Sequence, residues 1–579
     1  MFIRPIHVKK NGKRLAYWAL VESYRTQRGP RQRTVAYLGQ LDHRARLGLM
    51  QAAKGDNRDY QKQLFGDAEP EWVEVDAKRV RVERSLDFGG PWLALELLKC
   101  LGLISFFQEI ISTGRQDIEW SSMALVLIIC RLCHPSSELY IAEHIYEHTA
   151  LSDLLGIPAD KINDDRLYRA LDKLLPHKQR IEIYLKNRFG ELFDLEYDLL
   201  LYDVTSTYFE GQAKGNPLAQ YGYSRDRRSD CKQVCIALVV TRCGMPLGYE
   251  VFAGNRRDVT TVQEIVQTME SRYGQADRIW VMDRGMISEQ NIEFLKESER
   301  RYIIGTAKWM LKKYERELLA DDWQKVYEGL QVKVCQSPDG SETFILCRSA
   351  ERREKDKAIH ERFAKRIEQG LKDIEQSCSK HKHKPITIAK RLGRLLGRNS
   401  RAAGLFQTDV IEAEDGRAIL LWRKVQAWQD WAQLSEGCYL LRSNVNDWSG
   451  QEIWRAYVQL TDAESAFRIH KTDLRIRPIW HQKQQRVEAH ILVCFLAYVL
   501  WKTLGQMCRQ CGLGDEPRRV FDELGRIKVV DVVLPTKSGR EIRHRCVCQP
   551  TDHQAILLQR LGLNLPSYLP ITDGKVNGV

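Results

Sequence analysis

Three acidic residues in this chain stand at positions where a carboxylate needs a partner. Asp203 lies inside the apolar stretch Leu199–Val204, and Asp283 directly follows a later apolar stretch. Glu464 lies within Ile453–Lys471, which contains no Gly or Pro and is typical of a helix. An unpaired carboxylate in apolar surroundings is strongly unfavourable, so the three acids together require a cation or a metal ion.

The chemistry that such a set of acids supports is metal-dependent reaction at a phosphodiester. Each aspartate alone is a common residue at a strand end, but side chains at strand ends of α/β sheets converge on sites. Ligands that are all oxygen select hard cations such as Mg²⁺ or Mn²⁺. Two such ions, about 4 Å apart, serve in-line displacement at a phosphodiester. We therefore predict Asp203, Asp283 and Glu464 as catalytic residues and ligands of two ions per active site.

The stretch around Glu464 predicts one continuous helix over 453–471. Its apolar residues Ile453, Leu460 and Phe467 recur at steps of three and four and so share one face. Glu464 falls between Leu460 and Phe467 on that same face. We expect its carboxylate to point toward the core.

The elements that would position these acids form an α/β arrangement. From residue 195 to 307, three predicted strands are followed by a helix, a strand, a helix and a strand, which indicates a mixed sheet. Before this sheet we predict a small N-terminal β unit (1–60) and a helical domain that is either DNA-binding or scaffold (80–194). The sheet domain itself is predicted in two parts, 195–307 and 437–505, the second of which carries the Glu464 helix. A basic insertion with strands (308–436) separates the two parts, and a small α/β appendage (506–579) follows them.

The charge of the chain predicts a polyanionic partner. The 579 residues carry a net charge of +13, with a pI of about 9.0. Ser377–Arg401 holds eight Lys or Arg and no Asp or Glu. Such a block usually binds nucleic acid, although a solvated basic loop is the alternative, and charge does not separate DNA from RNA.

The termini and apolar runs favour a cytoplasmic protein without a membrane partner. The N-terminus has no apolar signal core, and the longest apolar runs, at 123–132 and 491–501, are shorter than a membrane span.

A spaced set of polar residues surrounds Glu464. Tyr457, Glu464 and Lys471 occur at the spacing of a Y-x2-R-x3-E-x6-K signature, with Leu460 at the Arg position. With YDVTSTYFEG around Asp203 and VMDRG around the second aspartate, the chain resembles bacterial insertion-sequence transposases of the DDE type. The resemblance is to the branch with a β-rich insertion before the catalytic Glu, and it spans roughly residues 195 to 504.

The resemblance implies a fold class, a substrate and contacts. It implies an α/β fold with a ribonuclease H-like mixed-sheet core and a β-containing insertion. It also implies Mg²⁺ or Mn²⁺, double-stranded DNA as transposon ends and target, and a homodimer on that DNA. Tyr457 and Lys471 would contact DNA phosphates, and Arg468, one turn beyond Glu464, could replace the missing Arg.

Other basic residues are weaker candidates for DNA contact. Arg225, Arg228 and Lys232 follow the first strand of the sheet and either line the DNA path or form a solvated turn. His490, on the apolar helix after Glu464, is expected to be a hydrogen-bonded core residue rather than part of the site.

Three functions remain compatible with these residues. The first is a transposase that binds the terminal inverted repeats of its insertion sequence and performs metal-dependent cleavage and strand transfer of the cut-and-paste type. The second is a related metal-dependent nuclease without strand transfer, and the third is an inactive DNA-binding relic. The complete set of acids argues against the relic, and the size of the chain argues against a simple nuclease.

Overall fold

The structure is a computed structural model that describes residues 2–10, 13–26, 29–39, 73–111, 114, 116–275, 277–337 and 340–570. The predicted N-terminal β unit is described up to residue 39, and its remaining residues lie outside the described ranges. It forms a three-stranded antiparallel sheet in the order β1-β2-β3. Its strands are β1 (Phe2–Lys10), β2 (Lys13–Thr26) and β3 (Gly29–Gly39).

A group of helices follows, as the apolar periodicity predicts. These helices are α3 (Gly89–Cys100), α4 (Leu103–Ile110), α5 (Trp120–Cys133), the single turn α6 (Glu138–Tyr140), α7 (Leu151–Leu155), α8 (Asp164–Leu174) and α9 (Lys178–Phe193). Helix α5 is apolar all round and almost wholly buried, so it is the central helix of this group.

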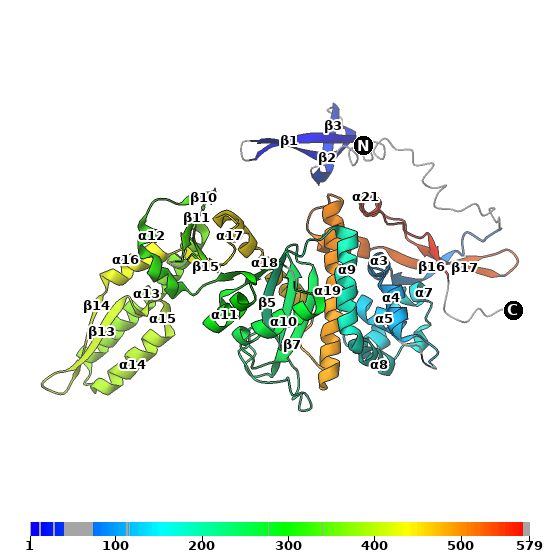
Figure 1. Cartoon of the computed structure of the whole chain (residues 1–579). Coiled ribbons are helices and arrows are strands. Elements are labelled where there is room, and N and C mark those ends of the chain that lie inside the picture. Colours follow the sequence, from blue (N-terminus) through cyan, green and yellow to red (C-terminus); the bar gives the residue numbers. More distant parts are fainter. Residues whose placement is uncertain are drawn as a thin grey trace.

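A later helix, α19 (Gln484–Gln510), joins this group to the sheet. It contacts α3, α5 and α8 on one side and β7 on the other, and it runs between them in Figure 1. Its length and apolar composition would suit a membrane span, but 83% of its most apolar window is buried inside the protein. Its apolar character is therefore accounted for by packing within the fold.

The central sheet begins with five strands in the spatial order β7-β6-β5-β8-β9. Their bounds are β5 (Leu199–Tyr208), β6 (Gln233–Thr241), β7 (Pro246–Ala253), β8 (Ile279–Met282) and β9 (Arg301–Gly305). The β5-β6-β7 meander is antiparallel, whereas β8 pairs in parallel with both β5 and β9. This mixed sheet agrees with the predicted ribonuclease H-like core.

Helices cover both faces of this sheet. Helices α10 (Val262–Tyr273) and α11 (Glu289–Glu297) pack on one face, in a core that includes Tyr202 and Met282. Helices α17 to α19 pack on the other face, in the core that includes Leu201. The alternation of side chains along each strand thus separates two hydrophobic cores.

Four further strands enlarge the same sheet, three from the insertion and one from the segment directly after it. In spatial order they are β10 (Gln324–Tyr327), β11 (Leu330–Gln336), β12 (Thr343–Ser349) and β15 (Cys438–Ser443), each antiparallel to its neighbour, with β15 antiparallel to β9. The sequence predicted the β15 strand as part of the core, but not that the strands of the insertion would join the core sheet. They do so because β15 covers the edge of β9 and itself presents an edge to β12.

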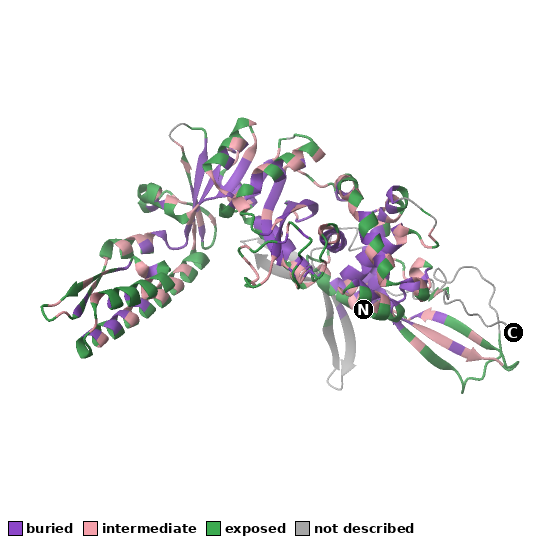
Figure 2. Ribbon diagram, turned by 90° about the horizontal axis from the view of Figure 1, so that it is seen from below, coloured by how far each residue is buried: buried purple, intermediate pink, exposed green. Residues whose placement is uncertain are grey.

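The rest of the insertion forms an arm that projects from the sheet, at the lower left of Figures 1 and 2. It consists of α13 (Ala350–Lys380), α14 (Pro385–Arg398), α15 (Ser400–Ala403), β13 (Phe406–Glu412), β14 (Ala418–Lys424) and α16 (Gln426–Ser435), with α12 (Glu315–Leu319) packed near α16. The arm has a small hydrophobic core of its own, which includes Ile367, Leu371 and Ile388.

The C-terminal segment returns to the start of the helical group. It contains α20 (Pro517–Gly525), β16 (Lys528–Pro535), β17 (Glu541–Val547), α21 (Asp552–Leu561) and β18 (Tyr568–Leu569). Strand β16 pairs with β4 (Arg81–Asp87) in a sheet ordered β18-β17-β16-β4. The sequence predicted an appendage but did not predict that it shares a sheet with residues before α3.

Candidate active site

The register of two parallel strands brings Asp203 and Asp283 together. Tyr202 of β5 pairs with Met282 of β8, so the two aspartates are next in line on adjacent strands. Asp283 keeps an extended backbone, with φ −74° and ψ 163°. Because side chains alternate and adjacent strands are roughly 4.8 Å apart, both aspartates face the side of the sheet on which α17 to α19 pack.

Glu464 comes from a helix on that side, but not as the sequence predicts. The expected single helix is two, α17 (Gly450–Val458) and α18 (Leu460–Thr472), with Gln459 between them. The prediction that Glu464 faces the core is wrong, because its side chain is exposed. The buried positions continue at helical spacing through Gln459, but their face runs along Ala456, Ala463, Ala466 and His470, to one side of Glu464. Glu464 lies at the border of that face, and α18 itself packs on β5 and β6.

The electrostatics of Asp203 show that the three acids influence one another. The pKa of Asp203 is raised to about 7, against 3.8 for an ordinary aspartate, mainly by burial and in smaller part by the charges of Asp283 and Glu464. The backbone N–H of Val204, which donates to Oδ1 at 2.8 Å, and the charge of Arg225 oppose this rise. The charged form of Asp203 is therefore unfavourable in this site unless a cation is bound beside it.

The ligand atoms of these acids are of the type that hard cations prefer, although the three carboxylates lie further apart than in a closed metal site. All of the donors are carboxylate oxygens, and a cation would offset the cost of ionising the buried Asp203. The three carboxylates do not all lie within 4.8 Å of one another. Tyr457, at the end of α17, donates its hydroxyl to Asp283 Oδ1 at 3.3 Å and so fixes the position of that carboxylate.

Comparison with known families decides what kind of protein carries this site. Residues 194–500, more than half of the chain, match the transposase DDE domain, and the match includes all three acids. The chain belongs to the DDE transposases. Residues 3–69 match the N-terminal domain of IS1634 family transposases, so this is a bacterial insertion-sequence transposase.

Two further comparisons add little. Among curated proteins, nothing matches the chain. Among solved structures, a cryo-EM structure of the piggyBac transposase synaptic complex with hairpin DNA aligns over 79% of this chain and 82% of its own. The identity is 9% and the TM-score 0.35, which is too low to support an assignment of fold.

The family agrees with the predicted class of protein and with its coarser consequences. DDE transposases use divalent metal ions and act on DNA, which confirms these two predictions at the level of the family. The identity of the ions, their number and the roles of individual residues in this transposase stay predictions.

The predicted DNA-contacting cations of the transposase core are paired with acids. Lys471 Nζ lies 3.0 Å from Asp226 Oδ1, and Arg225 pairs with Asp258. Arg228 pairs with Asp230 at 3.0 Å and with Glu210 at 3.4 Å. DNA contact through any of these side chains must therefore compete with an internal ion pair.

Two other predicted contacts have different surroundings. Arg468 is exposed, and its Nη2 donates to Ser465 Oγ at 3.3 Å on its own helix. Lys232 is half-buried just before β6.

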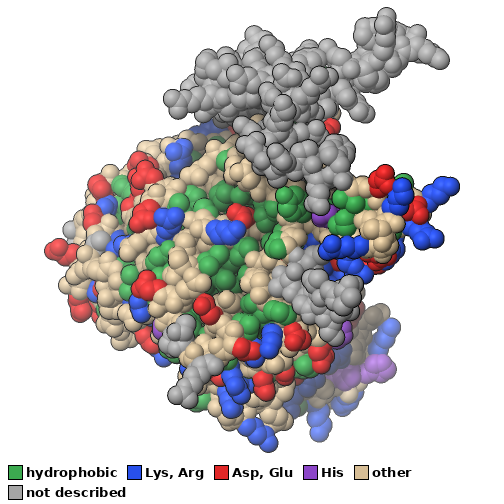
Figure 3. All heavy atoms as spheres, turned by 90° about the vertical axis from the view of Figure 1, so that its right-hand side faces the viewer, with side chains coloured by type: hydrophobic (Ala, Val, Ile, Leu, Met, Phe, Trp, Pro, Cys, Tyr) green, Lys and Arg blue, Asp and Glu red, His purple; other side chains and the backbone are tan. Residues whose placement is uncertain are grey.

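The predicted basic block forms an exposed helix. Ile388 and Leu392 of α14 are buried in the core of the arm, whereas Lys390, Arg394 and Arg398 are exposed. In the described part of the chain, no acidic side chain is paired with these three cations. By contrast, on the face in Figure 3 the drawn Lys and Arg side chains are interspersed with Asp and Glu around a hydrophobic patch.

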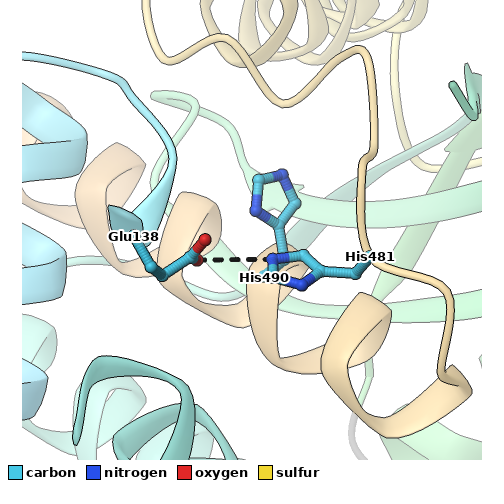
Figure 4. A group of neighbouring side chains, drawn as sticks. All are labelled: Glu138, His481 and His490. Carbon is cyan, nitrogen blue, oxygen red and sulfur yellow. Dashed lines mark ion pairs between the residues drawn. The ribbon is translucent and has the colours of Figure 1, made fainter. Parts of the chain in front are cut away.

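A second cluster resembles a metal site by spacing alone. Glu138, His481 and His490 bring one ligand atom each within 4.8 Å of one another (Figure 4). Arg131 Nη2 lies 3.4 Å from His490 Nδ1, and His490 Nε2 lies 3.2 Å from the carbonyl of Ile476. Because guanidinium only donates, Nδ1 accepts and Nε2–H donates, which fixes a neutral imidazole.

This arrangement identifies the second cluster as a hydrogen-bonded junction. Both nitrogens of His490 are engaged, and the buried guanidinium of Arg131 supplies the positive charge beside Glu138, whose carboxylate also pairs with His481 at 3.3 Å. Burial lowers the pKa of His490 to about 3, in agreement with a neutral ring. The expectation that His490 is a hydrogen-bonded core residue is correct.

Sequence reasoning missed several residues near the site. Asp226 and Arg477 flank Lys471, yet they occur in loops without a recognisable pattern. The same two loops carry exposed aromatic side chains, Tyr223 at 86% and Trp480 at 66% exposure. Their only signal in the sequence is an aromatic residue within a polar loop, which is too common to be specific.

Proposed function

We propose that this transposase binds the terminal inverted repeats of its insertion sequence and catalyses DNA cleavage and strand transfer at Asp203, Asp283 and Glu464. The observation that supports this best is the β5–β8 register, which aligns the two aspartates beneath α18. The raised pKa of Asp203 supports it independently, because it reflects a burial that a bound cation would offset.

The chemistry assigns a role to each residue of the site. The three acids would hold Mg²⁺ or Mn²⁺, two ions per active site, which activate the attacking water or 3′-hydroxyl and stabilise the leaving oxygen. Tyr457 keeps the Asp283 carboxylate oriented through its hydroxyl. Glu464 is exposed on α18, so its carboxylate is accessible to the scissile phosphate.

The basic surface would supply most of the affinity for DNA. Lys390, Arg394 and Arg398 lie one turn apart along α14 and face solvent, as is suitable for successive backbone phosphates. Cation–phosphate contacts of this kind are independent of sequence, so recognition of the repeats requires other parts of the chain. We infer that two protomers act together on two ends, in the bacterial cytoplasm.

A joining assay tests this function. A labelled duplex with the inverted-repeat end and a free 3′-hydroxyl is incubated with supercoiled plasmid, Mg²⁺ and the transposase, with Glu464→Gln as the inactive control. We expect label to enter the plasmid with the wild type only. A second duplex that carries the uncut end is tested in parallel. Cleavage of that duplex without joining would identify a nuclease, and binding without either reaction would identify a relic.

The dimer is tested in the same preparation. The mass of the complex with end duplex, measured by light scattering, should correspond to two protomers and two duplexes. A complex of one protomer with one duplex that still joins DNA would contradict the proposed dimer.

A further inference from the structure

Two cations beside the Glu464 helix share a single carboxylate oxygen. Lys471, in the last turn of α18, and Arg477, in the loop that follows, both pair with Asp226 Oδ1. The Asp226 side chain is 6% exposed, and its Oδ2 is buried with no hydrogen-bond partner among the described residues. The two cations therefore share one carboxylate oxygen, and the second oxygen of Asp226 binds neither of them.

More positive charge lies close by. Burial lowers the pKa of Lys471, Asp226 opposes this, and the charges of Arg477 and Arg225 lower the pKa further. Arg225 in turn influences Asp203, so this group of cations is adjacent to the acids of the active site. A phosphodiester carries one negative charge on two terminal oxygens, and it could accept hydrogen bonds from both cations at once.

The segment that carries Asp226 is held in a strained conformation. Asp226 lies in the connection between β5 and β6, and the next residue, Arg227, has a φ of 59°. A residue other than Gly adopts this left-handed region only at an energetic cost, so other contacts must hold the connection in place. The ion pairs of Asp226 are among those contacts, and a competing anion would release them.

We propose that Lys471 and Arg477 form a binding site for one phosphate of the DNA end, and that Asp226 occupies this site in the DNA-free transposase. The inference rests on the proposed function for the identity of its ligand. It also accounts for Leu460, which is buried and cannot supply the cation of the signature. Arg477 supplies that cation from the loop after α18, whereas Arg468 bonds to its own helix.

The first test uses inorganic phosphate and no DNA. Asp226→Asn keeps the shape of the side chain but removes the charge that competes with phosphate. We expect 10 mM phosphate to raise the melting temperature of Asp226→Asn by several degrees and to leave the wild type nearly unchanged. The double variant Asp226→Asn/Arg477→Gln should lose this response. Equal responses in all three proteins would overturn the proposal.

The second test uses end duplex in the DNA-binding assay. Asp226→Asn should bind about 3- to 10-fold more tightly than the wild type, and Arg477→Gln more weakly by a similar factor, with a salt slope smaller by about one. Arg477→Lys should recover part of the affinity, and Arg242→Gln, which removes an arginine paired with Asp198 after β6, serves as the matched control. Weaker binding by a folded Asp226→Asn would show that Asp226 is a structural clamp and would overturn the proposal.

A chemically modified duplex covers the case in which Asp226→Asn does not fold. Neutral methylphosphonates are placed singly along the end, and one position should weaken wild-type binding without affecting Arg477→Gln. If every position affects both proteins alike, the site does not bind a phosphate. The two hypotheses fail separately, since a phosphate response without any DNA joining would refute only the proposed function.

Discussion

The cations near the three acids and the cations on α14 have opposite surroundings. Lys471, Arg225 and Arg228 each pair with an acid of the protein. On α14, exposed cations such as Arg394 face solvent without an acidic partner in the described residues. Paired cations are held in position but gain little net energy from binding DNA, because an internal partner must be displaced. When unpaired cations bind DNA, counterions are released and no internal ion pair has to be broken. We therefore expect the cations of the arm to supply most of the affinity and the cations of the core to position the DNA.

The largest effect should follow from removing the cations of α14. We expect Lys390→Gln/Arg394→Gln/Arg398→Gln to weaken duplex binding by about 10- to 100-fold at moderate salt, with a salt slope smaller by about two to three. The loss should be the same for end duplex and for unrelated duplex, because phosphates carry no sequence.

The matched control removes equal charge from paired sites. Lys355, Lys372 and Arg417 each lie beside an acid, and their triple Gln variant should change affinity by less than about 3-fold. Fluorescence anisotropy over a range of salt concentrations measures both variants. Equal losses in the two would show that net charge, and not the location of the cations, controls binding.

A smaller effect should follow from giving α14 the acids that the core has. Gly393 and Gly397 lie on its exposed side, and a Cβ added at either position would meet no atom of the described residues within 4 Å. Gly393→Glu/Gly397→Glu would place carboxylates among the arginines, and we expect about a 10-fold loss of affinity. Because Gly disfavours a helix, stability should hold or rise by roughly 1 kcal/mol. The Gln pair is the control, and an equal loss in that pair would indicate a steric effect.

The third effect concerns stability, which the active site should lower. The pKa of Asp203 is about 7 in the folded protein and 3.8 in the reference state, so the unfolded chain releases this proton first as pH rises. Its stability penalty is absent below pH 4, grows between pH 4 and 7 and stays above that. Without metal, Asp203→Asn should thus be more stable than the wild type by roughly 1–3 kcal/mol at pH 8.

Denaturant unfolding at pH 4, 6 and 8 in chelator measures that difference. It should increase across the three pH values, and added Mn²⁺ should stabilise only the wild type. A stability difference between the two proteins that does not change with pH would show that folding does not shift the pKa of Asp203.

The smallest effect should come from a core cation with two acidic partners. Arg228→Gln is expected to change end binding by less than about 3-fold, because its charge is already offset by Asp230 and Glu210. Removing Asp230 as well should leave the affinity nearly unchanged in the same anisotropy assay. A loss of 10-fold or more in Arg228→Gln would place this residue with the α14 cations and break the contrast between the two regions.

The sequence predicted the parts of the site that depend on local pattern. The strand of Asp203 is recognisable from its apolar neighbours, and the mixed order of strands and helices correctly indicated the core. The break at Gln459 was not predicted, because 453–471 contains no Gly or Pro to mark it. The exposure of Glu464 was missed because the buried face runs through Ala456, Ala463 and Ala466, whose small side chains give a weak apolar signal.

Ion pairs between residues far apart in the sequence could not be predicted either. Lys471 and Asp226 are 245 positions apart, and only the folded loops bring them together. The charge block at 377–401 was visible in the sequence, but whether acids from elsewhere would neutralise it depended on the arm, which leaves α14 exposed. Local pattern thus predicted which residues could act, and long-range packing decided which of them are free to do so.

The central claim is that Asp203, Asp283 and Glu464, and not the Glu138 cluster, hold the catalytic metal ions. Electron paramagnetic resonance titration of Mn²⁺ into the complex with end duplex tests it directly. We predict two bound ions per protomer in the wild type and in Glu138→Gln, with binding at least 10-fold weaker in Asp203→Asn, Asp283→Asn and Glu464→Gln. Unchanged binding in those three variants, or loss of binding in Glu138→Gln, would contradict the account.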